Sequence, residues 1–359
     1  MPSTVLVLNN EQMEGLISMR EAIDAMEIAY RELGEGVARL IPRHRIQLPK
    51  KTQPGVDYWF NNIPAAVPAF NTMALRIDSA GVRVREVAGM VRKDFPGDYV
   101  GLVLLFDIET NALTAMLFDH YLSPIRVAAT SALVAKYLAR QQASVVGLFG
   151  TGEQARAHAE AFCEIRKVKR IKVYSPTRAN REAFAREMTG RLDVQVQAVD
   201  DPRAVVEGVE IVIAATNSNE PVFKGEWLEP GTHVVTIRGS DRHVKQRETD
   251  PSTARRADII AINDRAQVKL DGQPELLELL DQGLLRWEAL HEVTEFVLGR
   301  APLRQDERQI TVHYNNVGMG IQFAAVGAII EKKARSRGVG TEIPADLFIT
   351  RKGGGLWSP

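Results

Sequence analysis

The sequence has little of what marks a secreted or membrane protein. A single cysteine, Cys163, excludes a disulfide within the chain. The longest apolar runs, such as residues 100–106, end well short of the roughly 20 residues that a membrane-spanning helix needs. The first fifteen residues, MPSTVLVLNNEQMEG, contain neither the basic segment nor the long apolar segment of a secretory signal. We therefore expect a cytoplasmic protein without a membrane partner.

The chain also lacks an excess of either charge, because 45 Lys and Arg residues balance 45 Asp and Glu residues. Proteins that bind nucleic acid usually present a basic face, so a nucleic-acid partner is not expected. The hydrophobic fraction of 45% and the charged fraction of 25% are those of an ordinary globular protein. At 359 residues the chain exceeds the usual size of one core, which predicts two domains.

The first part of the chain mixes one helical segment with several short strand-like segments, which is typical of an α+β unit. We expect a helix over residues 19–33 and strands over residues 43–48, 73–78, 101–107 and 113–118. A final amphipathic helix over residues 320–335 is expected to pack back on this unit.

From residue 145 the pattern changes to alternating strands and helices, which predicts a parallel sheet with helices on its faces. The fold class is therefore predicted to be α/β. The expected strands are residues 145–149, 171–174, 194–198, 211–215, 234–237 and 259–262.

A dinucleotide-binding turn is predicted where the first of these strands ends. The residues GTGEQA fit the pattern Gly-x-Gly-x-x-Gly/Ala, follow an apolar strand and open a helix. A pyrophosphate would meet free amides and the positive end of the helix dipole there. Thr216 and Asn217 close the fourth strand and are expected near the nicotinamide ribose, although polar loops are common at strand ends. The predicted residues of the turn are Gly150, Thr151, Gly152, Glu153, Gln154 and Ala155.

The end of the second strand predicts a preference for NADP(H), with NAD(H) as the alternative cofactor. An NAD site usually has an acidic residue here, which accepts hydrogen bonds from the ribose hydroxyls. This chain instead has Ser175, Thr177, Arg178 and Arg181. Two hydroxyls and two guanidinium groups suit a 2′-phosphate. The alternative is that the arginines form a solvated helix face.

Arg126 is a candidate for binding the anionic group of a substrate. The sequence SPIR predicts a helix with Ser123 as N-cap and Pro124 in the first turn, followed by small residues. Arg126 would then lie where the helix dipole disfavours a cation, so it needs an anion. A substrate carboxylate is one candidate, and a structural Asp or Glu is the alternative. Arg43 and Arg76 are further cations beside apolar strand-like segments.

Asp241 is the candidate for exchanging a proton with a reacting nitrogen. It follows the fifth expected strand, at the edge where open α/β sheets bind their ligands. The alternative is that its side chain only stabilises an Asx turn. His120, His158 and His313 are isolated and show no metal-ligand spacing, so no metal is expected.

These segments together resemble the ornithine cyclodeaminase/μ-crystallin family over most of the chain. The arginine- and alanine-rich helix followed by the glycine turn is far more specific than either feature alone. The matching segments are residues 42–44, 101–110, 121–132, 150–155, 231–234, 239–241 and 309–311.

The resemblance implies a Rossmann-type parallel-sheet domain, residues 126–316, inserted in an α+β substrate-binding/dimerisation domain. That second domain comprises residues 1–125, to which residues 317–359 return. The resemblance also implies a homodimer. The implied activity is an NAD(P)-dependent oxidoreductase acting on the C–N bond of an α-imino or α-amino acid, as an imine reductase or an amino acid dehydrogenase. The alternatives are an ornithine cyclodeaminase, which makes proline and ammonia, and a non-catalytic ligand-binding protein like μ-crystallin.

By the same resemblance, Arg43 and Arg126 hold the substrate carboxylate, and Asp241 exchanges protons with the amine or iminium. The chain departs from the family at Arg76, where a lysine is usual. Arginine keeps its proton at ordinary pH, so Arg76 can bind a carboxylate but cannot take over base chemistry from that lysine. The Asn-Asn pair at residues 315–316 is also unusual for the family. One interpretation is that the pair serves a bulkier or more acidic substrate, and the alternative is that it lies on a solvated surface.

Overall fold

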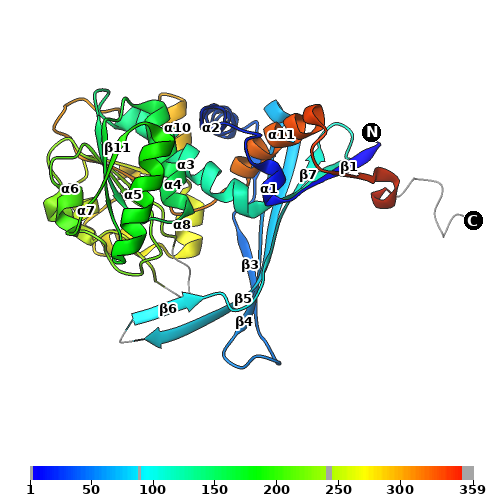
Figure 1. The fold of residues 1–359 in the computed structure, drawn as a ribbon, viewed down its shortest axis with the longest axis horizontal. Coiled ribbons are helices and arrows are strands. Elements are labelled where there is room, and N and C mark those ends of the chain that lie inside the picture. Colours follow the sequence, from blue (N-terminus) through cyan, green and yellow to red (C-terminus); the bar gives the residue numbers. More distant parts are fainter. Residues whose placement is uncertain (1–2, 88–89, 240–244, 350–359) are drawn as a thin grey trace, which may run out of the picture.

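The structure is a computed structural model that describes residues 3–87, 90–239 and 245–349. It contains two sheets, and the long helix α3 (Asp119–Leu138) lies between them and packs against helices from both sides (Figure 1). The sheets therefore meet through a shared apolar core that runs from the first strand to the last long helix.

The first sheet has nine strands in the order β17-β1-β8-β7-β5-β4-β2, with β3 paired to β4 and β6 paired to β5. All these pairs are antiparallel except that of β1 with β8. The strands are β1 (Thr4–Leu8), β2 (Arg39–Leu40), β3 (His44–Pro49), β4 (Asp57–Val67), β5 (Thr72–Val87), β6 (Met90–Asp94), β7 (Val100–Asp107), β8 (Leu113–Phe118) and β17 (Thr341–Pro344).

One face of this sheet is covered by helices. An added Cβ at Gly320 would meet Ala65, and one at Gly327 would meet Leu105, so α11 lies close against alternate residues of β4 and β7. The helices on this side are α1 (Asn10–Met13), α2 (Met19–Gly34), α3 and α11 (Gly320–Arg337), with 3₁₀ turns at Pro68–Phe70 and Ala345–Phe348.

The other face of the nine-stranded sheet is apolar and only partly buried. Strand register places Leu75 beside Leu104, and Leu104 beside Met116, on this face. These side chains are half-buried, whereas their neighbours on the helix-covered face are fully buried. The half-buried set on this face includes Pro64, Met73, Leu75, Ile77, Leu102, Leu104, Phe106 and Met116.

The second sheet has eight parallel strands in the order β11-β10-β9-β12-β13-β16-β14-β15. Its central strands are buried on both faces and therefore read as almost continuous apolar runs. The strands are β9 (Val145–Phe149), β10 (Arg170–Tyr174), β11 (Gln195–Ala198), β12 (Ile211–Ala214), β13 (His233–Thr236), β14 (Ile259–Ile262), β15 (Leu290–Glu292) and β16 (Thr311–Tyr314).

Helices cover both faces of the parallel sheet, and alternate strand residues belong to two separate apolar clusters. The helices are α4 (Glu153–Ile165), α5 (Arg178–Leu192), α6 (Pro202–Val206), α7 (Pro251–Arg256), α8 (Arg265–Asp271), α9 (Pro274–Asp281) and α10 (Val293–Val297), with 3₁₀ turns at Gly225–Trp227 and Trp287–Ala289.

The predicted α/β fold with a Rossmann-type parallel sheet is confirmed. Several strands were not predicted, namely β1, β2, β4, β6, β15, β16 and β17. Among them, β16 lies inside the parallel sheet, although its sequence Thr-Val-His-Tyr is too polar to read as a buried strand. Its His313 is nevertheless fully buried, because the Asn263 amide oxygen pairs with the ring Nε2 at 3.0 Å.

The predicted start of α3 is also wrong, because the helix begins at Asp119, so Ser123 is not its N-cap and Pro124 lies inside the helix. The first turn is held from outside, since the Tyr121 backbone N–H donates to Asn10 Oδ1 at 3.0 Å. Arg126 is consequently the eighth residue of the helix, beyond the reach of the N-terminal dipole. The predicted boundary between residues 125 and 126 falls within this helix, and the division into domains stays a prediction.

Candidate functional site

The glycine turn follows β9 and has a backbone that requires glycine at its first position. Gly150 has a φ of 107°, and an added Cβ would lie 2.1 Å from the carbonyl oxygen of Ala215. Gly152 is different, because a Cβ there would meet nothing within 4 Å. It is the N-cap of α4, and no side chain caps that helix. The turn therefore presents helix N-terminal amides beside open space, as a bound phosphate requires.

The remaining residues of the predicted turn have distinct surroundings. Ala155 is fully buried, so its small side chain allows α4 to pack closely on the sheet. Glu153 is exposed and its carboxylate contacts His120 Nε2 at 3.1 Å, while His120 Nδ1 contacts the Tyr99 hydroxyl at 3.1 Å. This exposed chain of three side chains joins the glycine turn to the start of α3 and to the segment before β7.

The residues predicted to bind a 2′-phosphate lie together at the end of β10, and each arginine already has a carboxylate partner. Arg181 is buried, donates to the Ser175 carbonyl at 2.9 Å and pairs with Asp200 at 2.5 Å. Arg178 is exposed and pairs with Glu182 at 2.7 Å. Thr177 is the N-cap of α5 without a side-chain hydrogen bond. Arg178 thus has the solvated position of a surface arginine, and Arg181 does not.

Glu248 is a buried residue that the sequence analysis missed, and it ties together the ends of β12 and β13. Its carboxylate accepts hydrogen bonds from the backbone N–H and the hydroxyl of Thr216, at 2.6 and 2.7 Å. It also accepts from the Thr236 hydroxyl and from the N–H groups of Ile237 and Arg238, each at 2.9 Å. Thr216 is therefore oriented by Glu248. Asn217, one residue further on, is exposed.

A chain of buried polar groups connects the glycine turn to α3. His158 Nδ1 lies 2.7 Å from the Gln154 carbonyl, and its Nε2 lies 2.9 Å from the Ser131 hydroxyl. Asn315 donates to the same hydroxyl at 2.8 Å and accepts from Asn263 at 2.7 Å. Burial lowers the pKa of His158 to about 4, so the ring is neutral, with Nδ1 as donor and Nε2 as acceptor.

Arg76 extends from β5 and is held by two carboxylates. Its guanidinium donates to Asp119 at 2.5 and 2.8 Å and also pairs with Asp78 on the same face of the strand. Asp119 reaches it across Gly101, where an added Cβ would lie 2.1 Å from the carboxylate. The positive charge of Arg76 is therefore compensated within the protein, and its neighbouring carboxylates raise its pKa against the effect of burial.

The surroundings of Arg126 differ from those of Arg76, because they do not compensate its charge within the described residues. Its Nη1 donates to the Gln322 amide oxygen at 2.8 Å, and its guanidinium carbon lies 4.9 Å from the centre of the Phe323 ring. Its buried Nε has no hydrogen-bond partner, and no carboxylate of the described residues forms an ion pair with it. Burial, and then the nearby charge of Arg76, lower its pKa to about 9. The alternative of a structural Asp or Glu partner is therefore wrong for the described residues.

Arg43 approaches the same region from the segment before β3, and its charge contributes to the lowered pKa of Arg126. Its guanidinium pairs with Asp271 at 2.5 Å, and its backbone N–H donates to Gln267 at 2.6 Å. Both partners belong to α8, so Arg43 joins the nine-stranded sheet to the parallel-sheet side. Asp241, the expected proton-exchanging residue, lies outside the described residues.

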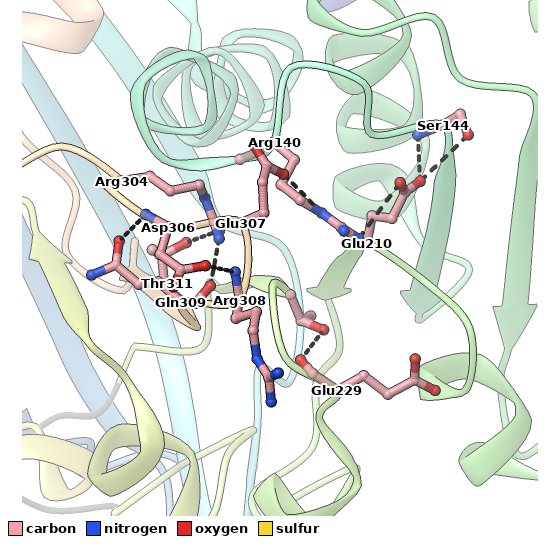
Figure 2. A network of polar contacts seen from close by, with 12 residues as sticks. Arg140, Ser144, Glu210, Glu229, Arg304, Asp306, Glu307, Arg308, Gln309 and Thr311 are labelled. Carbon is pink, nitrogen blue, oxygen red and sulfur yellow. Dashed lines mark hydrogen bonds and ion pairs between the residues drawn. The ribbon is translucent and has the colours of Figure 1, made fainter.

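The structure thus places three predicted arginines near one another at the junction of the two sheets. Figure 2 shows a different polar network, at the amino ends of the parallel strands. There Glu210 accepts from the Ser144 and Val145 N–H groups at 2.6 and 2.9 Å, and Arg140 lies 3.6 Å from its carboxylate (Figure 2). This network holds strand starts at the edge opposite the glycine turn, so we assign it a structural role.

Between residues 3 and 349, leaving out 88–89 and 240–244, no helix combines the length and apolar content that crossing a membrane demands. The same residues contain no group of three His, Cys, Asp or Glu side chains arranged to hold a metal ion.

The two glycines of the turn give a matched pair of variants. Gly150→Ala should destabilise the protein by more than about 2 kcal/mol, because the new Cβ collides with the Ala215 carbonyl and the backbone φ is unfavourable. Gly152→Ala should leave the free energy of unfolding nearly unchanged but weaken dinucleotide binding, since its Cβ enters the open space beside the helix amides. Urea denaturation and nucleotide titration measure the two effects. Equal stability of the two variants would contradict this interpretation.

Comparison with known proteins places the whole arrangement in a family. Residues 4–338 match the model of the ornithine cyclodeaminase/mu-crystallin family. A putative dehydrogenase of Rhizobium meliloti is 31% identical over 345 residues, which cover 93% of this chain and 97% of that protein.

Solved structures agree with this placement. The Thermococcus litoralis Δ1-pyrroline-2-carboxylate reductase, solved with NADH and L-proline, is 27% identical with a TM-score of 0.82, covering 94% of this chain and 100% of that one. An archaeal alanine dehydrogenase dimer with bound NAD is 25% identical with a TM-score of 0.79, covering 95% and 99%. The chain belongs to the ornithine cyclodeaminase/mu-crystallin family.

Proposed function

We propose that the protein is an NADP(H)-dependent oxidoreductase that reduces the C=N bond of an α-imino acid, or oxidises the corresponding α-amino acid. The observation that carries this proposal is the half-buried guanidinium of Arg126, whose buried Nε has no hydrogen-bond partner and which has no carboxylate partner among the described residues. Removing a cation from water without a counter-ion costs stability, and the carboxylate of a substrate would supply the compensating charge.

The position of Arg126 relative to the glycine turn supports the same activity. Arg126 lies within α3, and the buried chain through His158 and Ser131 fixes the turn against this helix. The described turn fits a dinucleotide, because Gly152 leaves open space beside uncapped helix amides. A nicotinamide cofactor supplies or accepts the hydride when bound. The similar Thermococcus litoralis reductase was solved with NADH and L-proline, a pair of ligands that suits this arrangement.

The protein's own groups would bind and orient the substrate. Arg126 would hold the carboxylate, while Arg43, already paired with Asp271, would contribute further positive charge. Arg76 carries a compensated charge, so we propose that it shapes the pocket through Asp78 and Asp119 and donates no proton. Proton exchange with the substrate nitrogen remains assigned to Asp241. Fixing the carboxylate positions the α-carbon for hydride transfer, and such positioning supplies much of the rate.

The proposal is tested by following oxidation of NADPH and NADH with cyclic α-imino acids, and with 2-oxo acids plus ammonia or methylamine. In Arg126→Gln we expect KM for the imino acid to rise by about 10- to 100-fold, because a charge-assisted bond to the carboxylate is lost. Cofactor affinity should not change. The exposed Arg300→Gln serves as the matched control.

An unchanged KM in Arg126→Gln would contradict the assigned role. Release of ammonia and proline from L-ornithine, without net change in the cofactor, would instead identify a cyclodeaminase. Tight ligand binding without turnover across the panel would favour a non-catalytic binding protein.

We further propose that Ser175, Thr177 and Arg178 bind a 2′-phosphate and thus favour NADP(H) over NAD(H). Arg178 is exposed, and a phosphate could replace its single partner Glu182. Buried Arg181 would act indirectly by holding the Ser175 carbonyl.

For this preference we expect Arg178→Gln to weaken NADPH binding about tenfold while leaving NADH binding unchanged, because only NADPH carries the phosphate. Arg186→Gln, on the same helix and exposed, is the control. Fluorescence titration of both nucleotides provides the measurement. Equal losses for NADPH and NADH, or none, would count against the phosphate site.

Finally, we propose a homodimer formed through the half-buried apolar face of the nine-stranded sheet, within a substrate-binding/dimerisation domain of residues 1–125 and 317–359. The nucleotide-binding domain would be residues 126–316. An apolar sheet face that no helix of the described residues covers is typical of an interface. The similar archaeal alanine dehydrogenase was described as a dimer.

The oligomeric state is checked by light scattering after size-exclusion chromatography. The wild type should have twice the chain mass of 39.8 kDa. Leu104→Glu should shift it to the monomer mass, because the charge lies in the centre of the apolar face. Leu284→Glu, at an exposed leucine outside this sheet, should remain dimeric. A monomeric wild type, or a dimeric Leu104→Glu, would contradict the proposed interface.

A further inference from the structure

Asn316 lies between the cofactor edge of the parallel sheet and the substrate arginine. It comes two residues after the end of β16, which is the strand next to β13. Its carbonyl oxygen is so close to Gly239 that an added Cβ there would lie 2.5 Å away. Two residues further on, a Cβ at Gly318 would lie 3.0 Å from Arg126 Nη1. The segment therefore passes from the end of β13 directly to the guanidinium of Arg126.

The side chain of Asn316 is buried with every polar atom unpaired. The residue is only 5% exposed, and neither Oδ1 nor Nδ2 has a hydrogen-bond partner. Its neighbour Asn315 is equally buried but donates to Val127 and Ser131 and accepts from Asn263. Buried polar groups are nearly always paired, because an unpaired one destabilises the fold. The two unpaired ends of the Asn316 amide therefore point to a ligand.

The position of Asn316 indicates that this ligand is the nicotinamide half of a dinucleotide. From the glycine turn at β9, the sheet continues through β12 and β13 to β16. A dinucleotide lies across this carboxyl edge, with its pyrophosphate at the turn. For hydride transfer, C4 of the ring must face an α-carbon whose carboxylate is held by Arg126. The ring carboxamide is attached to C3, next to C4, so it must also lie close to Arg126 and hence to Asn316.

The chemistry of the unpaired atoms fits the same group. A carboxylate would accept from Nδ2 and leave Oδ1 facing negative charge, and an iminium N–H would satisfy Oδ1 alone. A second primary amide satisfies both through two antiparallel N–H···O bonds. We propose that Asn316 binds the carboxamide of the nicotinamide ring and so fixes which face of the ring meets the substrate. This inference rests on the proposed function, since it requires a nicotinamide cofactor.

The experiment compares nucleotides with and without the nicotinamide group. Fluorescence and calorimetric titrations measure NADPH, NADH and the matching nucleotides that end at the ribose, 2′-phospho-ADP-ribose and ADP-ribose. In Asn316→Leu we expect at least a tenfold loss of affinity for NADPH and NADH, with less than a twofold change for the nucleotides that lack the ring. The melting temperature of the ligand-free variant should not fall, because no hydrogen bond is removed.

Two controls distinguish the loss of a contact with the nicotinamide ring from a structural effect of the substitution. Asn315→Leu removes three hydrogen bonds and should lower the melting temperature. The cofactor analogue with an acetyl group in place of the carboxamide keeps the acceptor but loses the N–H donor. The wild type should bind it several-fold more weakly than the parent cofactor, and Asn316→Leu should bind the two equally. Such coupling between the two changes would show a direct contact.

Each other outcome overturns the inference. Unchanged NADPH affinity, or parallel losses for all four nucleotides, would exclude a specific contact with the ring. A raised KM for the imino acid with unchanged cofactor affinity would assign the amide to the substrate instead. Failure of the wild type to bind any of the four nucleotides would overturn the proposed function itself, and so differs from failure of the Asn316 contact alone.

Discussion

The half-buried guanidinium of Arg126, which has no counter-ion among the described residues, is the constraint on which the arrangement of the two sheets depends. Arg126 lies in the middle of α3, and its immediate contacts come from the segment that returns to α3 from β16. Gln322 accepts its hydrogen bond, Phe323 lies against its guanidinium, and Gly318 leaves room for it. Gln322 is fixed in turn by donating to the Tyr30 and Thr130 hydroxyls at 3.0 and 2.9 Å. The guanidinium is thus oriented before any anion binds, which reduces the cost of binding one.

The same helix connects this charge to the nucleotide turn. Ser131, little more than one helical turn beyond Arg126, accepts from Asn315 and pairs with the neutral ring of His158. His158 contacts the carbonyl of Gln154, which belongs to the glycine turn. A shift of the turn would break buried hydrogen bonds, and these are expensive to lose. In the function that we propose, rigid, buried structure would therefore set the spacing between the substrate carboxylate and the cofactor, as precise hydride transfer requires.

The sequence was sufficient where the signal is local. The glycine turn, most strands of the parallel sheet and the helix predicted over residues 19–33 depend on short-range patterns, and the structure contains all of them. The predicted start of α3 was wrong, because the first turn of this helix is supported by Asn10, more than one hundred residues earlier. Ser-Pro is typical of a helix start, and the sequence alone does not show that Asn10 supports an earlier one.

The site residues that were not predicted also depend on partners that are distant in the sequence. Glu248 looks like an ordinary charged residue, and only the folded sheet brings five donors from the ends of β12 and β13 around it. The unequal states of Arg76 and Arg126 also depend on distant groups, since Asp119 belongs to another element than Arg76. The Asn315–Asn316 pair is unusual in the sequence, and the alternative of a solvated surface location is wrong, because both side chains are buried.

The most direct test of the central claim is to follow the hydrogen itself. The protein is supplied with NADPH carrying deuterium at C4 and with the α-imino acid that it reduces fastest, and the amino acid product is analysed by mass spectrometry and NMR. Our account requires one deuterium on the α-carbon of the product, transferred from one face of the ring only. A product with hydrogen from water at that carbon, or no transfer in the presence of both bound ligands, would contradict it.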